Sequence, residues 1–213
     1  MVEYKLERFL VGVDFGQAKD FTAIAVIRQL RHQENGTLHY EVVALDRPPL
    51  GAKYPTIVNY IIELLKNPTL SGKINGVQLS DSPPHETELV VDATGCGRPV
   101  VDMLRERGAK EYAHMVNCNI TGGQGLTCND DGFYGVPKRD LATVLQILFQ
   151  ESRIKIAESL PLGSILTQEL LNFRVKISPK TGNDSYEAWR ENDHDDMVLA
   201  AALAVWWADT YRK

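Results

Sequence analysis

The chain has 213 residues, and its 44% hydrophobic and 24% charged residues are typical of a folded globular protein rather than a disordered one. Its formal net charge of −5 argues against the basic surface by which most independent nucleic-acid binders neutralise phosphates. Its three cysteines have no C-x-x-C spacing, and its longest apolar run is well below the roughly 20 residues of a membrane span, so we expect reduced thiols and no membrane segment.

The first half of the chain predicts strands before helices. Residues 6–13 and 21–28 are apolar segments joined by a short polar turn, which indicates an antiparallel hairpin. Residues 38–45 follow an Asn-Gly turn signal and predict a third strand. Residues 54–66 have apolar side chains at helical spacing, and residues 88–92 predict a fourth strand.

The second half predicts helices around one further strand. Pro99 suits the first position of a helix that Gly108 would end. We expect a strand at 114–120, a glycine- and acid-rich loop at 121–136, and helices at 138–151 and 163–173. The last helix is expected to begin near Asn192 or Asp193 and to be buried through residues 197–208. This order predicts one α/β domain over residues 1–213 with a mixed sheet.

Two aspartates follow apolar strands. Asp14 comes after five apolar residues, and Asp92 comes after Leu89, Val90 and Val91. Either residue could simply begin a turn. If the two strands are parallel neighbours, however, both carboxylates emerge at the carboxyl edge of the sheet, where α/β proteins place ligands. Two adjacent negative charges repel each other, so the pair indicates a shared cation.

A third acidic group precedes the last helix and contains Asp193, Asp195 and Asp196. Acids are favoured in a first helical turn, so helix capping alone could explain them. Capping requires only one acid, and the others can point from the helix end toward the sheet edge. We therefore predict that acids of this group complete one site with Asp14 and Asp92.

Oxygen ligands select hard cations, so the predicted site favours Mg²⁺ or Mn²⁺. Three or four carboxylates can hold two ions about 3.5–4 Å apart. One ion would activate a water molecule, and the other would stabilise the leaving 3′ oxygen of a phosphodiester. This chemistry needs no side-chain nucleophile, and the sequence has no convincing Ser-His-Asp arrangement.

Six segments occur in the order seen in one family of viral nucleases. They are VGVDFG (11–16), DFTA (20–23), VVDATG (90–95), VPKRDL (136–141), ELLNF (169–173) and HDDMVLA (194–200). On these segments the chain resembles the nuclease domain of the large subunit of bacteriophage DNA-packaging terminases. The last segment is the most specific, whereas many RNase H-like proteins share VVDATG and the combination of VGVDFG with DFTA.

The resemblance implies an RNase H-like mixed sheet with helices on both faces. It also implies a metal-dependent endonuclease that cuts concatemeric viral double-stranded DNA by a two-metal mechanism during genome packaging. By position, Asp14, Asp92 and either Asp195 or Asp196 would be the metal ligands, and both of the last two could contribute. Asp20 also matches the family pattern, although it could equally cap a turn.

The family's proteins carry a packaging ATPase domain with a G-x-x-x-x-G-K-[ST] loop ahead of the nuclease, and this sequence lacks that motif. The sequence is therefore either an excised domain, which we expect, or a stand-alone relative. The expected partners are that ATPase domain, the portal and the small terminase subunit, in the cytoplasm of the infected host cell. DNA affinity supplied by the absent domain would explain the acidic net charge, so the chain alone is expected to bind DNA weakly.

Lys138 and Arg139 stand at a predicted helix start, where cations are unfavourable unless an anion is near. They are predicted phosphate contacts, with solvated surface charge as the alternative. His194 could touch the phosphate or a metal or be structural, and the loop at 121–136 could lie beside the DNA. Trp206 and Trp207 are expected in the core.

Three other functions remain open from the sequence. In sugar-kinase or actin-like ATP-binding domains, the phosphate-binding loops also follow strands that end in aspartate and have glycines nearby. The acidic group before the last helix of this chain, however, would repel nucleotide phosphates. A RuvC-type junction resolvase or a transposase-like nuclease would share the chemistry and differ in substrate. A non-catalytic interaction module would not need a full set of carboxylates.

Overall fold

A computed structural model describes residues 3–16, 20–71, 73–74, 77–78, 87–95, 97–123, 125–177 and 195–211. The strands form an eight-stranded sheet of order β10-β3-β2-β1-β6-β7-β9-β8, with a separate two-stranded sheet of β4 (Lys73–Ile74) and β5 (Val77–Gln78). Within these residues, no helix has both the length and the apolarity that a membrane crossing requires.

One half of the sheet is an antiparallel meander. It consists of β1 (Tyr4–Asp14), β2 (Ala23–His32) and β3 (Leu38–Asp46), which pair in sequence order. The expected hairpin and third strand are therefore confirmed, with each strand somewhat longer than its apolar segment. A strand not predicted from the sequence, β10 (Ile154–Ile156), pairs parallel to β3 at the sheet edge.

The other half of the sheet is mainly parallel. It consists of β6 (Thr87–Asp92), β7 (His114–Thr121) and β9 (Phe133–Pro137), which run parallel to β1. The edge strand β8 (Thr127–Cys128) pairs antiparallel to β9. The sequence-based expectation of a loop over residues 121–136 is therefore wrong in its second half. Phe133–Pro137 contains a glycine and ends in proline, which hid a short strand of the main sheet.

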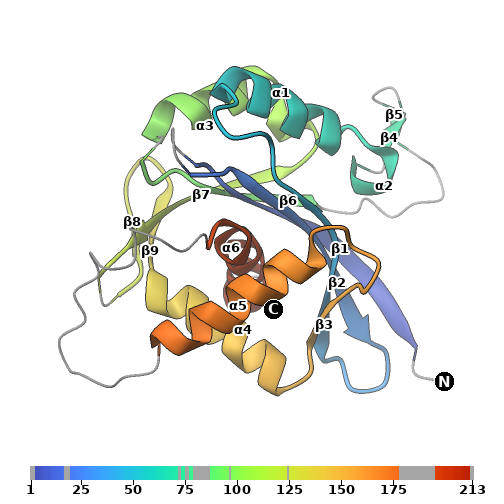
Figure 1. Ribbon diagram of the computed structural model, residues 1–213. Coiled ribbons are helices and arrows are strands. Elements are labelled where there is room, and N and C mark those ends of the chain that lie inside the picture. The colour runs from blue at the N-terminus through green and yellow to red at the C-terminus, as the bar shows by residue number, and fades with distance from the viewer. Residues whose placement is uncertain are drawn as a thin grey trace.

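Helices cover both faces of the sheet (Figure 1). One face carries α1 (Tyr54–Leu65) and α3 (Gly97–Glu106), and the other carries α4 (Lys138–Gln150), α5 (Gly163–Ile177) and α6 (Asp196–Tyr211). Two short elements complete this part of the chain, α2 (Pro68–Ser71) and the 3₁₀ helix η1 (Ala109–Glu111). The central helix α6 packs on β1 and β2, and all its residues from 196 to 208 are buried, as expected for 197–208.

Two helix starts differ from the sequence-based expectations. Helix α3 begins at Gly97, so Pro99 occupies its third position rather than its first, while Gly108 follows the helix with φ 80° as expected of a stop. Helix α6 begins at Asp196 rather than near residue 192, and the carbonyl of Asp195 accepts the N–H of Leu199 at 2.9 Å. Residues 192–194, including His194, lie outside the described residues.

Side-chain alternation decides which strand residues face α6. Leu10 of β1 and Val90 of β6 belong to the core under α4, α5 and α6, whereas Val11 and Val91 belong to the core under α1 and α3. Because successive side chains of a strand point to opposite faces, positions 12 and 14 follow Leu10, and position 92 follows Val90. Asp14 and Asp92 are therefore on the α6 side of the sheet.

Helix α6 approaches β1 closely at Gly12. A Cβ atom placed on Gly12 would lie 1.9 Å from the carbonyl oxygen of Ala200 and 3.1 Å from the Cβ of Ala204. Only glycine in the strand and small residues in the helix permit this separation. Asp196 lies one helical turn before Ala200, and Asp14 lies two residues after Gly12. The start of α6 is therefore placed beside the end of β1.

Candidate active site

The carboxyl ends of four mutually parallel strands meet at one edge of the sheet. Asp14 and Asp92 end β1 and β6 and are register partners, as the sequence predicted for neighbouring parallel strands. Lys138 directly follows β9, and Arg47 directly follows β3. Two acids and two basic residues therefore leave the sheet at the same edge, beside the start of α6.

Asp14 is a buried acid, with 8% of its surface exposed. Burial raises its pKa well above the ordinary value, and the negative charges of Asp92, Asp196 and Asp195 raise the pKa further, while Lys138 lowers it. All three other predicted acids therefore act electrostatically on Asp14. A bound cation would relieve this repulsion.

Asp92 is held by the turn that follows β6. The N–H and the hydroxyl of Thr94 donate to Asp92 Oδ1 at 2.8 and 2.5 Å, and the Thr94 hydroxyl oxygen accepts the N–H of Ile120 at 2.6 Å. Burial raises the pKa of Asp92, and the hydrogen bonds from Thr94 partly offset that rise. The orientation of this carboxylate is thus fixed before any ligand binds.

The two acids at the start of α6 each have a basic neighbour. Lys138 Nζ lies 2.8 Å from Asp195 Oδ2, and both side chains are about one-fifth exposed. Asp196 is buried, and its Oδ2 lies 3.7 Å from the guanidinium of Arg47. Lys138 therefore contacts an acid of the site in this structure, and its predicted contact with a phosphate stays a prediction.

In the ranges that the structure describes, no group of three His, Cys, Asp or Glu side chains could hold a metal ion as it stands. The four predicted acids are instead one adjacent pair and two residues beside cations. The donor set still fits Mg²⁺ or Mn²⁺, because it consists of carboxylate oxygens. In addition, the negative charges of the other three acids raise the pKa of Asp14, and a bound cation would offset that effect. Metal binding by Asp195 would require this residue to exchange Lys138 for the ion.

Two residues of this region had no assigned role from the sequence. Arg47 makes an ion pair with Glu169 of α5, and Glu169 Oε2 accepts the backbone N–H groups of Met197 and Val198 at 3.0 and 3.2 Å. Glu169 lies on the apolar face of α5 that Leu166 and Phe173 define, and an acid on such a face is a sequence signal for a buried partner. Arg47 had no comparable signal, since it follows a strand in a polar segment.

Two lesser candidates lie further out. Arg139 is half exposed and pairs with its neighbour Asp140 at 3.4 Å. Asp20 is exposed, and the N–H of Gly16 in the same turn donates to the Thr22 hydroxyl at 3.2 Å. Thr22 therefore supports this turn, and a ligand role for Asp20 stays untested.

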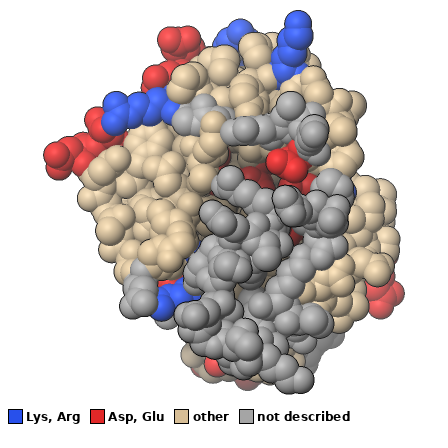
Figure 2. Space-filling view, turned by 60° about the vertical axis from the view of Figure 1, so that its left-hand side comes forward, with Lys and Arg blue, Asp and Glu red and all other residues tan. Residues whose placement is uncertain are grey.

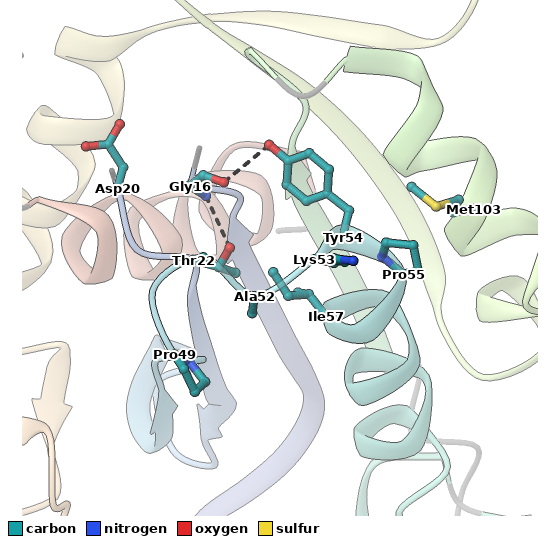
Figure 3. A pocket seen from close by; sticks show the side chains of 11 residues that line it. Gly16, Asp20, Thr22, Pro49, Ala52, Lys53, Tyr54, Pro55, Ile57 and Met103 are labelled. Carbon is teal, nitrogen blue, oxygen red and sulfur yellow. Dashed lines mark hydrogen bonds between the residues drawn. The ribbon is translucent and has the colours of Figure 1, made fainter. Parts of the chain in front are cut away.

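A cavity of about 510 Å³ lies beside the β1–β2 turn (Figure 3). The hydroxyl of Tyr54, at the start of α1, donates to the carbonyl of Gly16 at 3.3 Å across it. The lining residues are Gly16, Asp20, Thr22, Pro49, Gly51, Ala52, Lys53, Tyr54, Pro55, Ile57 and Met103. Its lining includes residues of α1 and α3, on the opposite face of the sheet from Asp14 and Asp92, and none of the four predicted acids lines it.

Figure 2 shows acidic side chains within a recess on one face of the molecule, whereas the lysine and arginine side chains visible in that view lie toward its margins.

No protein-family model and no curated protein sequence matches the chain. Solved structures that resemble it include two viral proteins. The human cytomegalovirus terminase nuclease domain, soaked with Mn and bound to an inhibitor, has a TM-score of 0.57 and 15% identity over 96% of this chain and 84% of that one. The fowlpox virus Holliday junction resolvase has a TM-score of 0.44 and 12% identity over 95% of this chain and 98% of that one. At such identities the likeness to the terminase domain shows the fold alone, and the predicted RNase H-like mixed sheet with helices on both faces is confirmed.

Proposed function

We propose that this chain is a divalent-metal-dependent endonuclease that hydrolyses phosphodiester bonds of double-stranded DNA. The observation that carries the proposal is the register pairing of Asp14 with Asp92 on the α6 side of the sheet, with Asp195 and Asp196 beside them. Four carboxylates at one edge repel one another, so their grouping does not stabilise the fold by itself. Bound cations would relieve that repulsion. Among the described residues, no pair of acids in register is found where β1 and β6 begin, at the opposite edge of the sheet.

The residues of this site have separate roles in the proposal. Asp14, Asp92 and one or both of Asp195 and Asp196 would hold two Mg²⁺ or Mn²⁺ ions, which would supply water activation and stabilisation of the leaving 3′ oxygen. Thr94 keeps Asp92 in place. Lys138, once released from Asp195, is close enough to the acids to contact the phosphate, and Arg139 is exposed for a contact further along the strand.

The biological setting we propose is viral genome packaging, in which a terminase cuts concatemeric DNA. The order of six sequence segments and the similarity of the fold to a viral terminase nuclease domain support this setting. In that setting the partners are a packaging ATPase domain, a portal and a small terminase subunit, and the protein acts in the cytoplasm of the infected host cell.

Incubation with supercoiled plasmid tests the function. We expect nicked and linear products with Mn²⁺ or Mg²⁺ and none with EDTA. Asp92→Asn removes a ligand charge but keeps the shape of the side chain, so it should cut at least about a hundredfold more slowly, because loss of metal-held transition-state stabilisation costs several kcal/mol. Asp102→Asn, in an exposed ion pair of α3, is the matched control and should cut at the parental rate.

Cleavage by Asp92→Asn at the parental rate would contradict the assignment of these acids as the active site. A four-way junction offered in competition with linear duplex tests the substrate, and strong preference for the junction would replace packaging with junction resolution. Thermal stabilisation by ATP without any DNA cleavage would favour a nucleotide-binding domain instead.

A further inference from the structure

Arg47, Glu169 and Asp196 form a buried charged group beside the two strand acids. Their side chains are 14%, 6% and 10% exposed. The three residues come from the end of β3, from α5 and from the start of α6, and Arg47 is 122 positions from Glu169 in the sequence. A contact between segments so far apart is a product of the fold and not of local helix or turn formation.

The positive charge of Arg47 lies closer to Glu169 than to Asp196. Its guanidinium nitrogen Nη2 makes a short hydrogen bond to Glu169 Oε1, whereas the same nitrogen is 3.7 Å from Asp196 Oδ2. The guanidinium carbon also lies 4.8 Å from the ring centre of Phe21, which holds the group over the aromatic face. Arg47 is thus directed at Glu169 and is only a neighbour of Asp196.

Glu169 also fixes the helix that carries Asp196. Its second oxygen accepts the N–H groups of Met197 and Val198, the first residues after Asp196 in α6. These N–H groups belong to the helix end whose donors have no partner within the helix. The Glu169 carboxylate therefore orients the start of α6 and also neutralises the charge of Arg47.

We propose that Glu169 is a positioning residue of the metal site, which keeps Arg47 from neutralising Asp196 and so leaves Asp196 able to bind a divalent cation. Among the described residues, Asp196 is the other carboxylate within ion-pair distance of the Arg47 guanidinium, so it would receive that charge if Glu169 lost its own. Arg47 would then compete with Mn²⁺ for that oxygen. The proposal rests on the metal-dependent function argued above and assigns Glu169 no contact with metal or DNA.

A double-mutant cycle on Mn²⁺ binding, measured by calorimetry without DNA, tests the proposal. Glu169→Gln keeps an amide oxygen for the N–H groups of α6 but removes the charge. We expect it to weaken Mn²⁺ binding about tenfold or more, the range typical of residues that orient metal ligands. Arg47→Met in the same chain removes the competing cation, and the double variant should recover most of the lost affinity. A purely structural role of Glu169 would give no such recovery.

The exposed pair of Arg28 and Glu41 provides the control, because Glu41→Gln and Arg28→Met change the same charges away from the sheet edge. Melting curves without metal identify any variant that fails to fold, and Glu169→Gln/Arg47→Met carries a neutral pair of similar size. Mn²⁺ affinity of Glu169→Gln equal to the parental value would overturn the proposal and leave the nuclease function standing. Absence of Mn²⁺ binding by the parental protein would overturn both. Mn²⁺ binding with the expected cycle but without DNA cleavage would support the positioning role and contradict the nuclease.

Discussion

The indole Nε1 of Trp207 donates a 3.0 Å hydrogen bond to Glu88, which is fully buried. The same carboxylate accepts from Arg8 at 3.1 Å and lies 2.7 Å from His114 Nδ1. Glu88 therefore connects β1, β6 and β7 to the second half of α6. The tryptophan lies in the core as the sequence predicted, and its polar atom has a specific partner there.

Glu88→Ala should destabilise the protein strongly. The substitution leaves the charge of Arg8 and the N–H of Trp207 in a buried place without their carboxylate, and breaking such a buried pair costs about 3–5 kcal/mol. Urea unfolding followed by tryptophan fluorescence measures the loss. Glu41→Ala, which breaks an exposed pair, should change the free energy of unfolding by about 1 kcal/mol or less. Equal losses for the two variants would contradict a structural role for the Glu88 contacts.

Asp14→Asn should stabilise the metal-free protein at neutral pH. The raised pKa of Asp14 means that, between the ordinary carboxyl value of about 4 and the raised value, the folded state binds a proton that the unfolded state releases. Stability of the parental protein therefore falls as pH rises through that window, and the asparagine variant lacks this fall. Melting temperatures in EDTA at several pH values test it, and Mn²⁺ should raise the melting temperature of the parental protein only. A variant less stable than the parental protein at neutral pH would contradict the charge argument.

Lys138→Met should tighten Mn²⁺ binding in the absence of DNA. The ammonium group 2.8 Å from Asp195 competes with a metal ion for that carboxylate, and its removal should lower the dissociation constant about threefold to tenfold, which corresponds to a weak ion pair. If the released Lys138 contacts phosphate in the loaded enzyme, the same variant should also show a higher KM for DNA. Calorimetry and nicking kinetics separate the two effects, with Arg139→Met as the neighbouring control. Weaker Mn²⁺ binding by Lys138→Met would contradict the competition.

Arg139→Gln should weaken DNA binding without changing metal affinity. Arg139 is exposed, and its guanidinium could neutralise one phosphate. Its removal should then reduce the magnitude of the slope of log K against log salt concentration by about one. Fluorescence anisotropy of a labelled duplex in the Asp92→Asn background measures binding without cleavage. Arg31→Gln, whose strand position pairs with Lys5 at the far end of β2, is the control and should keep the parental slope. Identical slopes for both variants would remove Arg139 from the DNA contact surface.

Gly12→Ala should disrupt the contact between β1 and α6. The added Cβ would meet the Ala200 carbonyl at 1.9 Å, which neither backbone can accommodate without moving. We expect a loss of stability of about 1–3 kcal/mol or more, together with weaker Mn²⁺ binding, because the displaced helix carries Asp196. Gly36→Ala, at an exposed turn with open space around it, should lose stability but keep Mn²⁺ affinity. Parental Mn²⁺ affinity in Gly12→Ala would contradict the link between this contact and the site.

Alternation along two strands accounts for most of what the sequence predicted about the site. Because Leu10 and Val90 belong to one core, Asp14 and Asp92 had to emerge on the same face and at the same edge once their strands were parallel neighbours. The N-terminal meander was equally predictable, since its strands are apolar and joined by short turns. The alternation within each strand and the meander depend on residues close together in the chain, whereas the parallel pairing of β1 with β6 was an assumption that the structure confirms.

Contacts between distant segments were not predictable from the same patterns. The ion pair of Arg47 with Glu169 joins residues 122 positions apart, and the pairing of Lys138 with Asp195 requires the fold to be known first. Strand β9 was missed because Gly135 and Pro137 lower its strand propensity, although its pairing with β7 and β8 overrides that propensity. The start of α6 was placed too early because several polar residues before Asp196 could each have capped it.

The close contact of Gly12 with Ala200 makes the spacing of the acids a property of the protein interior. About 6.6 Å of strand separates Gly12 from Asp14, and about 6 Å of helix separates Ala200 from Asp196. The contact between Gly12 and Ala200 therefore fixes the distance between the two aspartates. Homologous chains could vary their surface segments widely and still keep the same distance between these acids. A larger residue at position 12 would change that distance even if every acid were retained.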